Sequence, residues 1–568
     1  MQKIHYGLLL ALLLTAMPCL SAGAQDQEGQ GVSLHGSFQT DILVPQADSL
    51  IDTKYAGPFL SNSYLDLALS SQYVTAGARL ELMHMPLPGF EDNFAGGGLP
   101  YIYVTGNYKW FNMTVGNIYD QFGSGLIFRA YEDRPLGIDN SLRGARIVLN
   151  PYKGIRFKAL GGMQRAYFNY APENWYGFNY GMGAVMGADL ELGIEEWIPT
   201  MAENGYRLSL GASYVSKYEP DEDIILSTDP TKRLNLPKFV GAGDVRIRFQ
   251  KGGWNALVEY AYKANDPTAE NGYIYKPGTA ALLSLTYSQR GMAFLLQAKR
   301  SENMGFRSDR TGNGTSGNIN HLPAFTMTHT YALAAFYPYA TQTALGEWAF
   351  QAEARYTFKR KTPMGGKYGT SFRLNGSYVR GLKKTPVEMQ HGTYWGTQGY
   401  ESPFFGMGDE TYYLDVHLEF AKKITKTFSM TALYMYQQYN QKVVEGHGVN
   451  GDIVKSHIGI AELKYKPSKN IGMRMELQYL HTRQDLGQWV YGLYEISLFQ
   501  QCMIEISDLY NIDATRQHYY KIAATYNWGS HRIQLGYGRT RAGYNCSGGV
   551  CRFVPASKGL TLSYNVSF

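Results

Sequence analysis

An alternation of apolar and polar residues with a period of two runs through nearly the whole chain, and it constrains the fold more than any other feature. The last nine residues show it most clearly. One face of this segment carries Leu560, Leu562, Tyr564, Val566 and Phe568, and the other carries only Thr, Ser and Asn. Because successive side chains of a strand point to opposite faces, the pattern predicts a two-faced strand that extends to the last residue of the chain.

The same two-faced split recurs in segments 32–42, 74–82, 245–250, 348–358 and 473–479. In a soluble sandwich, the apolar face would cover a core and the charged face would meet water. In a membrane barrel, the apolar face meets lipid and the charged face meets an aqueous lumen. The period of two therefore favours an all-β fold but does not distinguish these two architectures.

The lengths of the connections between these segments favour the barrel. Short and long connections alternate along the chain, as in outer-membrane barrels with short periplasmic turns and long outer loops. The short ones lie near residues 70–72, 108–110, 150–154, 251–253, 290–291, 467–470 and 528–530. The sequence thus predicts an all-β fold with a single large antiparallel transmembrane β-barrel of roughly 24 strands (range about 20–26), an even number because both ends should be periplasmic.

The N-terminal residues have the features of a secretory signal. The first residues carry a single charge, residues 7–17 are apolar, and an Ala-Gly-Ala cleavage site follows. Pro18 directly before Cys19 disfavours a lipoprotein signal. We therefore expect a signal peptide at residues 1–24 and an outer-membrane β-barrel at residues 25–568.

Composition fits a membrane barrel. The chain contains 46 Tyr, 26 Phe and 8 Trp, which suits a protein that needs aromatic girdles at both membrane interfaces. No segment after the signal reaches the roughly 18 to 20 apolar residues that a membrane helix needs. The formal net charge of +6 is small for 568 residues and gives no reason to expect a nucleic-acid partner.

A barrel of about 24 strands encloses a lumen wider than side chains can fill. The first strand is expected near Gly31, which leaves no room for an N-terminal plug domain. Any constriction should therefore come from long loops that fold inward, with residues 302–345 and 381–408 as the main candidates. Within the first of these, residues 328–336 could instead form a strand.

The stretch 115–146 is dense in charge and is expected to form a strand, a loop and a returning strand. Its charged side chains could line a constriction that orients polar solutes. The candidates are Arg129, Glu132, Asp133, Arg134, Asp139 and Arg143. The alternative is an ion-paired loop that only maintains the shape of the barrel mouth, since structural ion networks are commoner than solute sites.

The cysteines are informative near the C-terminus. Cys546 and Cys551 flank four residues in the last long loop, and an oxidising compartment favours a disulfide between them. Closing so short a loop would give only modest stabilisation. Cys502 is left over on a candidate strand and is expected to face lipid.

Neither a catalytic site nor a metal or cofactor site is expected. His417 lies between Asp415 and Glu419 on one face of a strand. Side chains about 7 Å apart on such a face more often form a hydrated luminal ladder than a site. No nucleophile elbow or metalloprotease motif is present, so the chain is not predicted to be an enzyme.

Three segments carry a family resemblance: residues 115–146, 337–342 and 544–559. With them the chain resembles an uncharacterised family of outer-membrane barrels from Bacteroidota, a resemblance that implies fold and location but no activity. More distantly, Gly116, Phe122-Gly123 and the later Arg-Gly-Ala-Arg are similar to alginate-export-type porins. The chain departs from that pattern at Asn117 and Leu142.

The sequence thus predicts a protein of the bacterial cell outer membrane, with Tyr564, Val566 and Phe568 as its C-terminal barrel-assembly signal. Its expected partners are outer-membrane lipid and, during insertion, the barrel-assembly machinery. The leading hypothesis is a porin-like channel for the passive passage of polar small-molecule or oligosaccharide solutes, which needs no cofactor. The alternative is a barrel sealed by its own loops that acts as a scaffold or assembly partner for other cell-envelope proteins.

Overall fold

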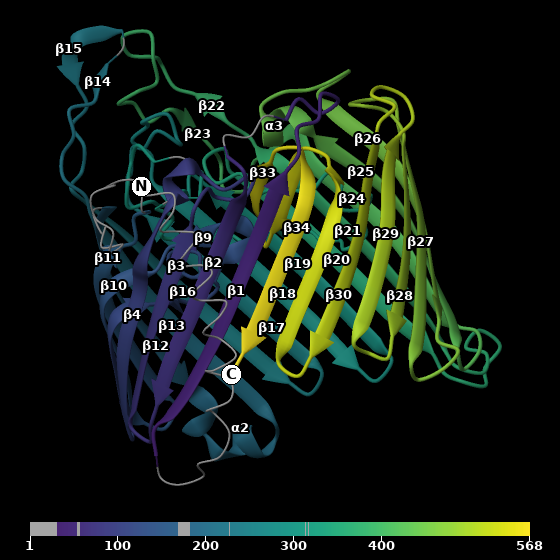
Figure 1. Cartoon of the computed structure of the whole chain (residues 1–568). Helices are drawn as coiled ribbons and strands as arrows, with labels where there is room; N and C mark the ends of the chain where they lie inside the picture. Colours follow the sequence, from purple (N-terminus) through teal and green to yellow (C-terminus); the bar gives the residue numbers. More distant parts are fainter. Residues whose placement is uncertain (1–30, 54–56, 168–181, 227, 313, 316) are drawn as a thin grey trace.

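The computed structural model describes residues 31–53, 57–167, 182–226, 228–312, 314–315 and 317–568. The expected signal peptide, residues 1–24, lies outside the described residues. Twenty-four antiparallel strands form one sheet that closes on itself, because β1 pairs with both β2 and β34. The prediction of an all-β, 24-stranded antiparallel barrel is confirmed (Figure 1).

The wall is built from strands that follow one another around the barrel in chain order. They are β1 (Ser33–Pro45), β2 (Leu60–Ser70), β3 (Val74–Met83), β4 (Gly96–Tyr108), β5 (Phe111–Ile118), β10 (Leu142–Tyr152), β11 (Ile155–Gln164), β12 (Met182–Gly193), β13 (Tyr206–Tyr218), β16 (Phe239–Lys251), β17 (Trp254–Lys263), β18 (Gly278–Gln289), β19 (Met292–Glu302), β20 (Glu347–Phe358), β21 (Thr370–Leu382), β24 (Met407–Lys423), β25 (Phe428–Asn440), β26 (Ile453–Tyr465), β27 (Ile471–Thr482), β28 (Trp489–Leu498), β29 (Cys502–Asn511), β30 (His518–Trp528), β31 (His531–Thr540) and β34 (Ser557–Ser567).

Short elements occupy the connections. They are β6 (Asp120–Gln121), β7 (Arg129–Ala130), β8 (Glu132–Asp133), β9 (Ile138–Asp139), β14 (Ile225–Leu226), β15 (Asp229–Arg233), β22 (Thr385–Pro386), β23 (Tyr400–Glu401), β32 (Gly543–Ser547), β33 (Val550–Val554), the helices α2 (Pro199–Glu203) and α3 (Gln441–Glu445), and the single 3-10 turns η1 (Asp92–Phe94), η2 (Arg134–Leu136) and η4 (Ile194–Glu196). No helix of the described part of the chain is long and apolar enough to cross a membrane.

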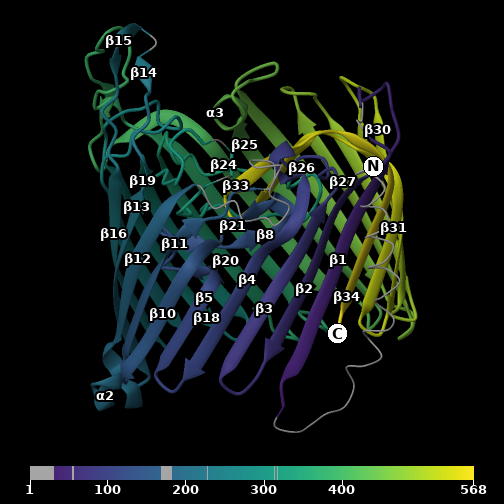
Figure 2. The ribbon, with the colours of Figure 1, turned by 60° about the vertical axis from the view of Figure 1, so that its left-hand side comes forward.

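The two ends of the barrel differ, as the sequence predicts. Short turns gather at one end, called the turn end here, and long connections gather at the other, the loop end (Figure 1). Two turn-end connections are longer than the alternation predicts: α2 and η4 lie between β12 and β13, and residues 359–369 join β20 to β21. Figure 2 shows the strands running diagonally across the wall, with β14 and β15 rising above the other loop-end segments.

Exposure along the strands is inverted relative to a soluble protein. On β16, Val245 and Ile247 are 58% and 52% exposed, whereas Arg246 between them is 5% exposed. On β27, Leu477 is 54% exposed and Glu476 is 3% exposed. Because the sheet is closed, its charged face turns inward and its apolar face turns outward, which is the arrangement of a lipid-facing wall rather than of a sandwich.

Exposed aromatic side chains mark both rims of this apolar surface. Near the turn end they include Tyr108, Trp110, Tyr152, Trp254, Tyr465 and Trp528. Near the loop end they include Tyr218, Phe239, Tyr262 and Tyr479. Amphipathic rings of this kind sit at the level of lipid headgroups, so the two sets bound an apolar band that a bilayer would cover.

The last strand closes the barrel. β34 is antiparallel to β31 on one side and to β1 on the other. The seam ends in two backbone hydrogen bonds between Gly36 and Phe568, at 2.8 and 2.9 Å. The two-faced strand expected at the C-terminus is therefore the element that joins the two ends of the sheet.

A filled lumen as the candidate functional site

The first lumen loop, residues 119–141 between β5 and β10, fills part of the barrel interior. Its residues Phe122, Leu126, Ile127 and Phe128 are at most 1% exposed and belong to one apolar cluster, the lumen core. The cluster also includes inward-facing wall residues of several strands. Because an apolar run excludes water from a lumen that the wall alone would leave polar, this loop acts as a built-in plug.

The second lumen loop, residues 303–346 between β19 and β20, runs through the interior to the wall strands β27 and β28. Leu333 donates its backbone N–H to the side chain of Gln478 on β27 (2.9 Å). The ring of Phe336 packs on Trp489 of β28 with centroids 5.1 Å apart. Residues 328–336, which the sequence leaves open between strand and loop, form turns and irregular chain inside this loop.

The loop at residues 383–406, the other expected constriction, lies elsewhere. None of its described residues belongs to the lumen core. It packs instead on the neighbouring loop-end connection: Tyr275 donates its backbone N–H to Thr397 (2.7 Å), and the Tyr273 ring packs on Trp395 with centroids 4.9 Å apart. Of the two loops expected to fold inward, only residues 303–346 contribute to the lumen core in the part of the chain that the structure describes.

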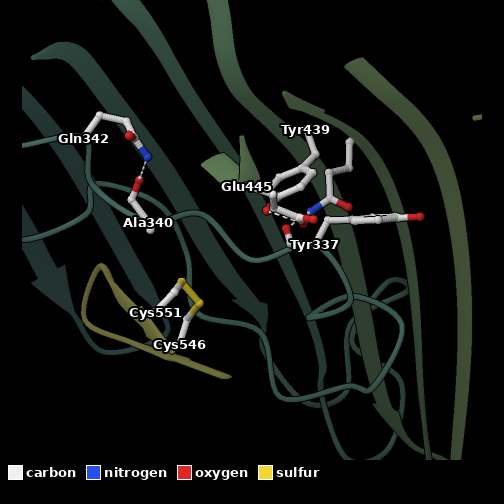
Figure 3. The surroundings of a disulfide bond; sticks show 8 residues. Tyr337, Ala340, Gln342, Tyr439, Glu445, Cys546 and Cys551 are labelled. Carbon is white, nitrogen blue, oxygen red and sulfur yellow. Dashed lines mark hydrogen bonds between the residues drawn. A yellow bond between two sulfur atoms is a disulfide. The ribbon is translucent and has the colours of Figure 1, made fainter. Parts of the chain in front are cut away.

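A disulfide hairpin, residues 543–554, packs on the second lumen loop (Figure 3). Cys546 and Cys551 are bonded, as the sequence predicts. The tip of the hairpin accepts two backbone hydrogen bonds from this loop. The N–H of Ala324 donates to Gly548 (3.4 Å), and the N–H of Thr341 donates to Gly549 (2.9 Å). Residues 324–341 are called the crossing segment here. The hairpin is therefore hydrogen-bonded to both ends of the crossing segment.

Two of the predicted constriction residues, Glu132 and Arg134, are paired with the wall. Arg79 of β3 donates two hydrogen bonds to the Glu132 carboxylate, at 2.7 and 3.0 Å. Arg134 bridges Glu132 (2.9 Å) and Asp66 of β2 (2.8 Å). Burial is the largest influence on Glu132 and raises its pKa.

Asp139 belongs to the same network through a residue that the sequence gives no reason to select. Arg165, directly after β11, binds Asp139 and, at 2.7 Å, Glu81 of β3. Burial alone would raise the pKa of Asp139, but Arg165 and Arg79 outweigh it and hold the pKa below its usual value. The ion network thus fastens the first lumen loop to strands β2 and β3 and to the end of β11.

The other three predicted constriction residues have different positions. Arg129 lies over the ring of Tyr131, 4.1 Å from its centroid. Asp133 accepts a hydrogen bond from the backbone N–H of Leu136 and so caps η2. Arg143 is part of the wall on β10. Glu132, Arg134 and Asp139 are therefore the candidates that the fold brings together.

A cleft of about 540 Å³ remains between the plug and the wall strands β1, β2, β30, β31 and β34. Its lining has a single carboxylate and several cationic side chains. The carboxylate is Asp41, and the cations are Arg134, Lys521, Arg541 and Arg552. The cleft is therefore an electropositive space of small-molecule size beside the plug.

Two of these arginines lack a carboxylate partner in the described part of the chain. Arg541 lies 3.6 Å above the ring of Phe336, and Arg552 lies 4.0 Å above the ring of Phe90. Nε and Nη1 of Arg552 are buried without a hydrogen-bond partner. Burial lowers the pKa of both groups, but a guanidinium stays protonated in proteins. Period-two patterning could not reveal these residues, because both lie in the loop between β31 and β34.

The family model of DUF6029, described as a family of unknown function, matches residues 1–568. The chain belongs to the DUF6029 family. The prediction of a family without an established activity is confirmed, whereas a source in Bacteroidota stays a prediction, as does the distant similarity to alginate-export-type porins. No curated protein matches this DUF6029 chain significantly.

Several solved structures align with most of the DUF6029 chain at low similarity. A mutant of the ferric enterobactin receptor PfeA from Pseudomonas aeruginosa is 9% identical, with a TM-score of 0.40, and the alignment covers 95% of this chain and 81% of that one. OccAB3 of Acinetobacter baumannii is 10% identical (TM-score 0.34; 94% and 99% covered). The P pilus usher PapC translocation pore is 10% identical (TM-score 0.38; 95% and 99%). Similarity at this level gives no information about the activity of the DUF6029 chain.

Proposed function

We propose that this barrel is a constricted, porin-like channel of the bacterial outer membrane through which small polar solutes diffuse, with a preference for anions. The observation that carries the proposal is the pair Arg541 and Arg552 in the cleft beside the plug, neither of which forms an ion pair within the described residues. The outward apolar band supports the membrane location. Its partners are then outer-membrane lipid and, during insertion, the barrel-assembly machinery.

The anion preference follows from electrostatics in a narrow space. Charged clefts with low-dielectric walls concentrate ions of opposite sign. A ring of cationic side chains selects for anions, provided that the ions bind weakly enough to leave again. Arg541 and Arg552 keep their charge without a fixed counter-ion, so a passing carboxylate, phosphate or chloride would take that place. Passive diffusion of this kind needs no cofactor.

A second function, a sealed scaffold for other envelope proteins, is favoured by a different observation. The second lumen loop crosses the interior and is clasped by the disulfide hairpin, which would close the lumen to solutes. The surface for partners would then be the loop end, where β14 and β15 stand above the other connections (Figure 1). In that case the barrel conducts nothing, and its function depends on what the raised loops bind.

Conductance of the purified, folded protein in a planar bilayer tests the proposal. We expect stable openings, and a reversal potential in a KCl gradient that shows a preference for chloride over potassium. The double variant Arg541→Gln/Arg552→Gln should lose most of that preference while still conducting. Lys455→Gln is the matched control, because Lys455 is exposed on the outward face of β26 and its removal should leave selectivity unchanged.

Two results would overturn the channel proposal. A protein that is folded but electrically silent would make the sealed scaffold the leading function. A conducting protein with unchanged selectivity in the double variant would place the path outside the cleft.

A further inference from the structure

The inner face of β24 carries a buried histidine and a buried carboxylate two residues apart. His417 and Asp415 are 1% and 0% exposed, and Nδ1 of His417 lies 2.9 Å from Oδ1 of Asp415. The sequence predicts a hydrated ladder that includes Glu419, but Glu419 pairs with Arg373 instead. A third side chain, His329 of the second lumen loop, joins the pair from inside the lumen.

His329 reaches the same carboxylate from the other side. Its Nε2 lies 2.5 Å from Oδ2 of Asp415, and its ring packs edge-to-face on the His417 ring with centroids 4.9 Å apart. One candidate ligand atom from each of the three residues lies within 4.8 Å of the other two. Two imidazoles and one carboxylate are donors that zinc and related transition-metal ions accept.

A buried polar atom without a partner distinguishes this cluster from a satisfied hydrogen-bond network. Nε2 of His417 is buried and makes no hydrogen bond. Buried polar groups nearly always have a partner, so such an atom indicates a group that the described residues do not supply. An ion in the middle of the cluster would replace the two hydrogen bonds to Asp415 by bonds to Nδ1 of His417, Nε2 of His329 and the carboxylate.

The charge around the cluster also favours a cation. No Lys or Arg of the described residues forms an ion pair with Asp415, whose partners are the two histidines. The two other groups of three possible ligands consist only of carboxylates, and arginines already pair with both. They are Glu81, Glu132 and Asp139, and Glu219, Glu222 and Asp309.

Space for further ligands lies beside the cluster. A cavity of about 180 Å³ reaches His329 and is also lined by Tyr413, Tyr339 and the hairpin residue Gly548. Its volume accommodates several water molecules. Three protein ligands and one or more waters form an open zinc site.

We propose that His329, Asp415 and His417 bind one divalent transition-metal ion, with Zn²⁺ as the ion that best suits this donor set, and that the ion pins the second lumen loop to the wall. Two ligands come from the wall strand β24 and one comes from the loop, so the ion joins elements that are otherwise connected only by weaker contacts. Metal binding then sets how firmly the crossing segment holds its place in the lumen. This inference does not depend on whether the barrel conducts.

Metal stoichiometry of the folded barrel is the test. The purified protein is stripped with a chelator, checked for folding by its heat-dependent migration on gels, and titrated with Zn²⁺ by calorimetry. We expect one ion per chain. Replacing a ligand by a residue that cannot bind the ion, as in His417→Ala or the loop variant His329→Gln, should weaken binding on the order of tenfold or more. His457→Ala is the matched control, because His457 lies on the outward face of β26 and should not affect zinc binding.

A second measurement distinguishes an ion that attaches the second lumen loop to the wall from an ion that binds without any structural effect. Zn²⁺ should slow proteolysis of the second lumen loop in the wild-type barrel and should have no such effect in His329→Gln. The proposal is overturned if the folded barrel binds no zinc, if His417→Ala binds as tightly as the wild type, or if zinc leaves the loop equally sensitive to protease. A substoichiometric ion that is unaffected by both ligand substitutions, His417→Ala and His329→Gln, would be adventitious and would also overturn it.

Discussion

Arg165 is the most deeply buried cation of the ion network that attaches the first lumen loop. Its guanidinium contacts Glu81 and Asp139, and all three side chains are at most 6% exposed. Burying charges is costly, and the pair is stabilising only as long as both signs are present. Removing the Arg165 charge would leave two buried carboxylates with only the more distant Arg79, 3.6 Å from Glu81 and 3.8 Å from Asp139, to balance them.

Arg165→Gln should release the first lumen loop. Breaking a buried ion pair from one side typically costs about 3–5 kcal/mol, because the partner charges stay buried and unpaired. We expect faster proteolysis within residues 119–141 while the wall strands stay protected. Arg233→Gln is the control, since Arg233 pairs with Asp223 at the surface and its loss should change nothing measurable. Equal protease resistance in wild type and Arg165→Gln would contradict a fastening role for this arginine.

Asp139 gives the same attachment a pH dependence. Its pKa in the folded loop lies below the ordinary value near 3.8, so its ionised form stabilises the attached loop. For a lowered carboxyl pKa, the stabilisation is complete above about pH 4 and is lost as the pH falls through the folded value. Pepsin should therefore cut residues 119–141 of the wild type more readily as the pH is lowered below about 4, whereas the cutting of Asp139→Asn should depend less on pH. Glu132 acts in the opposite sense: burial raises its pKa, so the attached loop binds this proton more tightly than a released loop would, and protonation of Glu132 does not release the loop. An equal pH dependence of cutting in wild type and Asp139→Asn would therefore contradict the role of Asp139.

At the scale of elements, the disulfide hairpin links the C-terminal loop to the plug. Its two backbone bonds to Ala324 and Thr341 depend on the tip geometry that the Cys546–Cys551 bond maintains. Closing a loop of this size contributes about 2 kcal/mol to the stability of the hairpin in the chain-entropy model. The wall has its own ladder of strand pairs, so the bond should matter for the hairpin and the loop beneath it, not for the barrel.

The variant Cys546→Ser/Cys551→Ser should therefore loosen two regions and spare the rest. We expect faster hydrogen exchange at residues 543–554 and in the crossing segment 324–341, with unchanged exchange in β34 and β1. Reducing the wild-type protein should have the same effect, and reducing the double variant should have none. Unchanged hydrogen exchange in residues 324–341 would mean that the hairpin contacts the loop without stabilising it.

The sequence predicts the strands far better than it predicts the contacts between segments that are distant in the chain. Alternation on β16, with Val245 and Ile247 on one face and Arg246 on the other, is a local property, so strand identity and facing could be inferred from the residues. The contact between Arg165 and Glu81 joins positions 84 residues apart, and that between His329 and Asp415 joins positions 86 apart. Nothing in a period of two specifies which loop enters the lumen, because loop backbones have no repeating side-chain pattern.

The candidate site shows the same limit. Charge density in residues 129–143 marks a segment whose Glu132, Arg134 and Asp139 form ion pairs, but the role of these residues as a constriction stays a prediction. The spacing of Cys546 and Cys551 correctly predicts their bond. Arg541 and Arg552 gain their importance only from the apolar rings beneath them and from the absence of a paired carboxylate within the described residues, which are properties of the folded loops.

At the scale of the whole molecule, the lumen is wide, and the first and second lumen loops fill a part of it. A barrel of 24 strands leaves far more space than side chains of the wall can fill. Replacing residues 325–338 by a short Gly-Ser linker should therefore give a folded barrel with a conductance several times that of the wild type. Shortening the raised segment 224–234 is the control, since the residues of it that the structure describes lie outside the lumen core and its loss should leave the conductance unchanged. A shortened second lumen loop with unaltered conductance would show that the ions avoid this part of the lumen.

Closure of the barrel depends on the last residue of the chain. Phe568 exchanges two backbone hydrogen bonds with Gly36, and a Cβ on Gly36 would approach the Phe568 ring to 2.4 Å. The absence of a side chain at Gly36 is thus what lets the terminal ring lie against β1. We expect Phe568→Ala to reduce the yield of folded, heat-modifiable barrel sharply, because the face of Tyr564, Val566 and Phe568 would no longer present its final aromatic during assembly.

Two further variants distinguish a specific contact between Gly36 and Phe568 from a general need for aromatic residues. Phe499→Ala removes an aromatic side chain that is 68% exposed at a turn, and it should leave the yield unchanged. Gly36→Ala should impair closure when Phe568 is present and should have little further effect in Phe568→Ala, since residues in direct contact are not additive. Additive losses would mean that Gly36 is needed for another reason, and a normal yield of Phe568→Ala would remove the C-terminal face from the assembly of the barrel.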